Sequence, residues 1–273
     1  MLKSGVNRGF ILLVTFLLLA GCGEYEKILK SRDYAMKYDK AIEYYNAGEF
    51  VRASTILDQV VNIYRGTLKA DTVKYYQAMS YYGQRDYMLA GHYFNELALT
   101  YTGSAFLEEC EYMEAYCYYK LSPRPDLDQE ATYKAMTALR MYIVKYPTSD
   151  KVEQCKELVQ ELGDKIVEKS YNSAKLYYDL GYYKSAIIAL RNSLEEYPET
   201  HHREELMFLI LKSSYLLADG SVESKRKERL QSAIDEYLSF ESEFPDSKYA
   251  REAERMYKGT LKTLELYTTN EDI

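Results

Sequence analysis

The chain has 273 residues and contains no tryptophan, only 3 histidines, 4 cysteines, 5 prolines and 13 glycines. So little proline and glycine argues against a turn-rich fold and favours a mostly helical protein. The histidines and cysteines form no HExxH or CxxC arrangement, and there is no glycine-rich phosphate loop. We therefore expect no catalytic residues, no bound cofactor and no metal, which makes an enzyme an unfavoured interpretation.

An excess of basic charge is also missing. Lysine and arginine number 35 against 42 acidic residues, for a net charge of −7. Nucleic acid and anionic lipid headgroups are therefore not expected partners. The basic run at 225–229 is interrupted by Glu228 and indicates a solvated loop and helix start. With 47% hydrophobic residues, the chain can still build a packed core.

The prominent apolar run, FILLVTFLLLA at 10–20, has eleven residues, whereas a spanning helix needs about 20. It follows two basic residues, which is typical of a signal peptide. It leads into LAGC at 19–22, which resembles the lipobox of bacterial lipoproteins, whose cysteine thiol carries the diacylglycerol. We expect residues 1–21 to be removed, Cys22 to be lipidated and 22–33 to be a lipid-anchored linker. The alternative is an ordinary cleaved signal with a chance cysteine.

Three further cysteines are Cys110, Cys117 and Cys155. The first two are seven residues apart on one expected helix, which separates them by about 10 Å and prevents a disulfide between them. Cys155 could pair with either in an oxidising compartment, but the odd number favours small buried residues.

An eight-residue pattern, Tyr-x-x-Ala-x-x-Tyr-Tyr, occurs four times, starting at Tyr38, Tyr75, Tyr112 and Tyr171. The first three copies are each 37 residues apart, which indicates a repeat protein. On a helix the four positions form one stripe that faces a partner. The alanine of each copy lets that partner approach closely; these are Ala41, Ala78, Ala115 and Ala174.

The first, second and fourth copies are followed by the same elements of a second helix: a turn, an aromatic residue, an alanine three residues later and a bulky residue four further on. In the fourth copy these are Gly181, Tyr183, Ala186 and Leu190. The third copy is followed by a longer loop and then by Ala135 and Leu139. The pattern resembles the tetratricopeptide repeat. We expect φ > 0 at Gly48 and Gly181, where first helices end.

The sequence therefore predicts an all-α, tetratricopeptide-repeat-like α-solenoid over 34–273, of about five helix pairs with a C-terminal closing helix. The expected units span 34–66, 71–103, 108–148, 167–199 and 205–246, with the closing helix at 249–267. An extra amphipathic stretch after Pro147 is expected to continue into the fourth unit as one long helix or two stacked ones.

The tyrosines of the repeated pattern are the candidate binding residues. The flanking pair of each copy is expected to face the groove of the solenoid, where rings are half-buried and hydroxyls stay wet. The expected peptide groove consists of Tyr38, Tyr45, Tyr75, Tyr82, Tyr112 and Tyr119. The alternative is plain core packing. The middle tyrosines, Tyr44, Tyr81, Tyr118 and Tyr177, are expected in the core. His92 is expected to be packed or at the surface. The pair His201 and His202 is expected in a surface loop, unable to face one metal easily.

A lipobox, a short linker and five tetratricopeptide-like units resemble the BamD (ComL) family, lipoproteins of the outer-membrane β-barrel assembly machinery. The most specific stretch is YPTSDKVEQCKELVQELGDKIVEKSYNSAKLYYDLGYYKSAIIALRNSLEEYPET at 146–200. The resemblance implies an outer-membrane lipoprotein on the periplasmic side. It also implies two partners: unfolded barrel proteins on the N-terminal units, and BamA-like periplasmic domains of the barrel subunit on the C-terminal units.

Two other classes stay open. One is a glycan-binding or other scaffold lipoprotein built on a helical repeat, which is disfavoured by the length of the chain and its lack of tryptophan. The other is a glycan-cleaving enzyme, disfavoured because no glutamate lies in a glycine- or serine-rich turn of the kind that would suggest a glycan-cleaving site on a helical scaffold.

Overall fold

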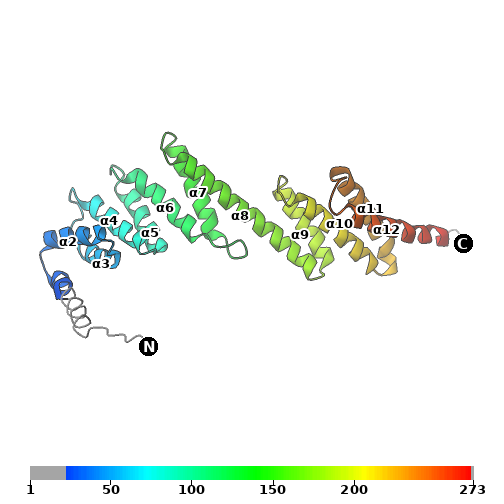
Figure 1. Ribbon diagram of the computed structural model, residues 1–273, viewed down its shortest axis with the longest axis horizontal. Coiled ribbons are helices and arrows are strands. Elements are labelled where there is room, and N and C mark those ends of the chain that lie inside the picture. The colour runs from blue at the N-terminus through cyan, green and yellow to red at the C-terminus, as the bar shows by residue number, and fades with distance from the viewer. Residues whose placement is uncertain (1–22, 272–273) are drawn as a thin grey trace, which may run out of the picture. The chain divides into compact units, whose positions relative to one another are not determined.

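The computed structural model describes residues 23–271, and within this range all regular structure is helical (Figure 1). The helices that follow the first are α2 (Tyr34–Asn46), α3 (Phe50–Val60), α4 (Ala70–Gly83), α5 (Tyr87–Thr100), α6 (Leu107–Leu121), α7 (Glu130–Lys145), α8 (Val152–Asp179), α9 (Tyr183–Glu196), α10 (Arg203–Asp219), α11 (Glu223–Glu243) and α12 (Ala250–Glu271). The predicted all-α fold of tetratricopeptide-like helix pairs is confirmed. No helix in the described range is long and apolar enough to span a membrane.

The chain divides into two compact units. The described part of the first runs to Pro123 and resumes over Glu130–Gln160, and the second contains Arg124–Gln129 and the chain from Glu161 onward. Helix α8 contributes residues to both. It is one continuous helix of 28 residues, which decides between the two arrangements left open by the sequence.

Small residues occupy the helix crossings in both units. Ala41, Ala78 and Ala115 of the first unit are fully buried, and Ala174 of the second is 3% exposed. The alanines of the second helices are buried as well: Ala53, Ala90, Ala135, Ala186 and Ala233. The expected close approach of paired helices at these alanines is therefore confirmed.

The first helix of several pairs ends in the same turn. Gly48 and Gly181 both have φ 76°, as expected. The residue after each glycine donates its N–H to the carbonyl of a middle tyrosine, Glu49 to Tyr44 at 2.8 Å and Tyr182 to Tyr177 at 2.9 Å. This is the hydrogen bond of a Schellman motif. In the second pair Arg85 takes the glycine position with φ 64°.

Residues 22–33, expected to be a linker, are instead helical from 23 to 30. Ile28 on this helix is buried in the same apolar cluster as Ala41. The buried Lys37 ammonium donates to Leu29 O at 2.9 Å and to Gln59 Oε1 at 2.7 Å. The segment therefore packs against the first helix pair through Ile28. Cys22 and the expected signal peptide lie outside the described residues.

The three cysteines of the described range are buried free thiols, as favoured by the odd count. Burial raises the pKa of Cys110 and of Cys117 to about 12. Cys117 lies close to Gly91, where an added Cβ would be 3.2 Å from the Cβ of Cys117. These thiols are packing residues.

Candidate functional site

The flanking tyrosines lie between successive first helices of the first unit. The Tyr45 ring meets Tyr76 edge-on at 5.1 Å, which links α2 to α4. The Tyr82 ring lies 6.5 Å from Tyr116, which links α4 to α6. Five of the six expected groove tyrosines are half-buried, all except Tyr112. Tyr45, Tyr75 and Tyr82 are therefore partly used for packing between neighbouring repeats, and their side chains keep some exposed area.

Tyr76, Tyr116 and Phe106 were missed by reasoning from the repeat, since none stands at a recurring position. Phe106 stacks on Tyr75 at 4.3 Å with an interplanar angle of 15°. Burial, followed by the nearby Glu109 carboxylate, raises the pKa of Tyr75 to about 12. The only sequence signal for these additional aromatic residues was the high tyrosine content of this part of the chain. Tyr76 and Phe106 extend the ring contacts of Tyr45 and Tyr75, and Tyr116 joins Tyr82 to Tyr112 and Tyr119.

Tyr112 does not face an open groove, so its assignment there is wrong. Its side chain is 7% exposed, and its hydroxyl donates to Gln154 Oε1 at 2.9 Å. Just before α8, the Lys151 ammonium lies 2.6 Å from the Glu109 carboxylate. The segment after Pro147 therefore packs against α6 and covers Tyr112.

The middle tyrosines are not core residues, so that expectation is also wrong. Tyr44, Tyr81 and Tyr118 are half-buried, and Tyr177 is 45% exposed. The Tyr81 hydroxyl donates to Asp58 Oδ2 at 2.7 Å, and this bond adds to burial in raising its pKa. A phenol at the end of a helix satisfies its hydroxyl best at the surface, where a carboxylate of the preceding pair accepts it.

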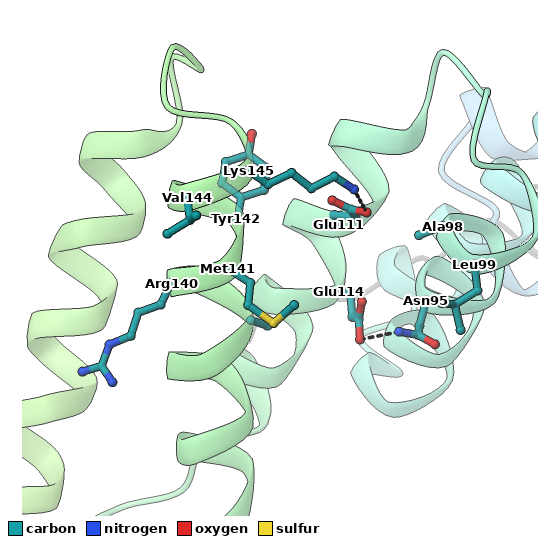
Figure 2. Close-up of a pocket in the computed structure, with 11 residues that line it drawn as sticks. Asn95, Ala98, Leu99, Glu111, Glu114, Arg140, Met141, Tyr142, Val144 and Lys145 are labelled. Atoms are coloured by element: carbon teal, nitrogen blue, oxygen red, sulfur yellow. Dashed lines mark hydrogen bonds and ion pairs between the residues drawn. The ribbon is translucent and has the colours of Figure 1, made fainter.

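An open apolar cleft of about 700 Å³ lies over α6, between α5 and α7 (Figure 2). Met141 of α7 projects into it, and Leu99 of α5 forms the opposite wall. These side chains are 67% and 74% exposed, and Val144 at the rim is also exposed. Exposed apolar side chains grouped around one cavity are typical of an interaction site.

Two glutamates of α6 supply the charge of the cleft (Figure 2). Glu111 Oε1 accepts from the Lys145 ammonium at 2.5 Å, and Glu114 Oε1 accepts from the Asn95 amide at 2.8 Å. Burial raises the pKa of Glu114 above its usual 4.5. The cleft thus combines an apolar wall with a partly desolvated carboxylate. Its apolar residues fall outside the repeated motif, so the sequence pattern did not reveal them.

The histidines fall in two places. His92 is exposed on α5, within the range of outcomes expected for it. His201, His202 and Glu168 each place one ligand atom within 4.8 Å of the others, which is closer than expected of two histidines in a surface loop. The turn after Pro198 brings both rings against α8, whose length the sequence left open.

The paired helices and the apolar cleft define a tetratricopeptide-like scaffold of the kind that binds other proteins. Comparison with protein families narrows this class to one family. Residues 31–230 match the family described as outer membrane lipoprotein, YfiO. The chain belongs to this family, which is of the BamD type, and this confirms the resemblance found in the sequence.

Two solved structures illustrate the range of similar folds. The TPR2AB domain of yeast Sti1, solved in a complex with pHSP90, is 13% identical with a TM-score of 0.39, and the match covers 83% of this chain and 98% of that one. A tetratricopeptide repeat protein from Parabacteroides merdae is 14% identical with a TM-score of 0.37, covering 85% and 100%. No curated protein matches the chain.

Proposed function

We propose that this outer-membrane lipoprotein is a periplasmic subunit of a Bam-like assembly complex, anchored through Cys22. Its first unit binds unfolded β-barrel precursors, and its second unit docks the periplasmic domains of a BamA-like barrel subunit. Membership of the outer membrane lipoprotein family supports the setting. The observation that carries precursor binding is the open apolar cleft between α5 and α7.

A barrel precursor suits this cleft because its strands alternate apolar and polar side chains, with aromatic residues near the membrane interfaces. Every second side chain of an extended segment points the same way, so one apolar face can meet Met141 and Leu99 while the other stays in water. The half-buried rings of Tyr45 and Tyr82 offer a second contact surface of the same chemistry.

A matched pair of methionines tests precursor binding at the cleft. Met141 and Met88 are 67% and 71% exposed on second helices of the same unit, and only Met141 lines the cleft. Met141→Gln should weaken a labelled C-terminal barrel peptide about tenfold or more, since burying a methionine contributes about 1.5–3 kcal/mol. Met88→Gln should leave the affinity, measured by fluorescence anisotropy, unchanged.

Tyrosine variants distinguish binding at the tyrosine rows from binding at the cleft. Tyr75→Ala with Tyr82→Ala should weaken the peptide strongly in a folded protein if the tyrosine rows are the groove, while Met141→Gln would then bind normally. If the rings are packing residues, the double variant should lose stability by about 3–5 kcal/mol per truncation at most. Equal affinity of every folded variant and the parent would reject precursor binding at both surfaces.

The second unit offers exposed apolar side chains for the barrel subunit. Leu176 and Tyr182 are 55% and 61% exposed near the turn between α8 and α9, and Ile188 is exposed on α9. Pull-down from detergent-solubilised envelopes should recover the barrel subunit with the parent chain, and Ile188→Asp should reduce its yield. Recovery of an oligosaccharide instead, with no barrel subunit, would favour a glycan-binding scaffold.

A further inference from the structure

Glu168, His201 and His202 form a cluster in the second unit that the proposed function does not use. Glu168 lies on α8, and the two histidines form the end of the turn before α10. His202 Nε2 lies 2.8 Å from Glu168 Oε2, and the rings of the two histidines have centroids 3.9 Å apart. One ligand atom from each residue lies within 4.8 Å of the others.

The surrounding structure holds two of the three groups in place. The His202 ring stacks on the buried Tyr171 at 3.7 Å with an interplanar angle of 2°. The His202 backbone N–H donates to Thr200 Oγ1 at 3.2 Å. Glu168 is fixed by a continuous helix. Only His201 is exposed, and it can move the short distance that coordination needs, since ligands around tetrahedral Zn²⁺ lie about 3.4 Å apart.

Two of the neighbouring cations, Arg203 and Lys169, have partners other than Glu168. Arg203 donates to Glu243 and to Pro198 O, and Lys169 donates to Leu127 O at 2.6 Å. The positive end of α10 opposes a cation here, and Glu204 in its first turn offsets part of that effect, whereas Glu205 is paired with Lys175.

We propose that Glu168, His201 and His202 bind a divalent transition metal ion of the Zn²⁺, Ni²⁺ or Cu²⁺ class. Two imidazoles and one carboxylate are ligands that suit these ions and not Mg²⁺ or Ca²⁺, which prefer oxygen donors. Three protein ligands leave a fourth position for water. The ion would tie α8 to the turn before α10 and so stabilise the second unit, since a ligand that binds only the folded state raises its stability by mass action.

Titration calorimetry on the untagged full chain in detergent, stripped with a chelator, tests the site with ZnCl₂ and with MgCl₂ as a comparison. We expect one saturable Zn²⁺ site and none for Mg²⁺. His201→Ala and Glu168→Gln should lose it, and His201 is exposed, so that variant should stay folded. His92→Ala is the matched control, because His92 is the remaining histidine of the chain and lies on α5.

A second measurement separates loss of metal from loss of fold. Zn²⁺ should raise the urea midpoint of the parent and of His92→Ala, and should leave that of His201→Ala unchanged, with circular dichroism spectra equal in all three. The buried Cys110 and Cys117 should not compete, since burial keeps these thiols protonated. Absence of stoichiometric Zn²⁺ binding by the parent, or binding that persists in His201→Ala, would overturn the proposal.

Discussion

Gly83 tests how the first helix pair meets the second. A Cβ added at this residue, the last of α4, would lie 2.5 Å from ring carbons of Phe50 at the start of α3. Contacts this short force the ring or the helix to move, and overpacking of this kind costs about 1–3 kcal/mol. Gly163 in α8 is the control, because a Cβ there meets no atom within 4 Å.

Both substitutions add one methyl group at a helical glycine, and they differ mainly in the atoms that the new Cβ meets. Gly163→Ala should raise the unfolding free energy by about 0.5–1 kcal/mol. The change in unfolding free energy for Gly83→Ala should be lower than that for Gly163→Ala by about 1–3 kcal/mol. Urea unfolding followed by circular dichroism measures both, since the chain has no tryptophan to report by fluorescence. Phe50→Leu should relieve Gly83→Ala in the double variant. Equal stabilisation by both alanines would refute the contact between Gly83 and Phe50.

Two further predictions concern charge and anchoring. Burial raises the pKa of Glu114 above 4.5, so the stability that this group contributes is fully present below about pH 4.5 and is lost as pH rises through its folded pKa. Glu114→Gln should therefore raise the urea midpoint at about pH 7 and match the parent near pH 4; an equal gain at both would contradict the burial effect. Cys22→Ala should leave the precursor uncleaved or the protein unanchored, because the variant lacks the thiol expected to carry the diacylglycerol. Stable anchoring needs the several acyl chains that lipidation supplies. Unchanged mass and membrane fractionation of that variant would show that Cys22 carries no lipid.

The repeat was predictable from the sequence because its signals are local. An alanine at a fixed position of each copy, and glycine at Gly48 and Gly181, depend on the helix period and on backbone conformation alone. The burial of individual tyrosines was not predictable in the same way. Tyr112 is covered by α8 and Tyr81 is held at the surface by Asp58, and both partners are far away in the chain.

By itself, then, the sequence determined the class of the fold, the close helix crossings and the family, since each follows from a pattern repeated along the chain. Only the tertiary structure decided which side chains are available to a ligand. The cleft at Met141 joins residues from separate helices and the cluster at His201 joins a helix to a turn, and no spacing within one helix encodes which surfaces of different segments meet. Whether a side chain is exposed to a ligand depends on which other segments pack over it, and those contacts form only when the whole chain has folded.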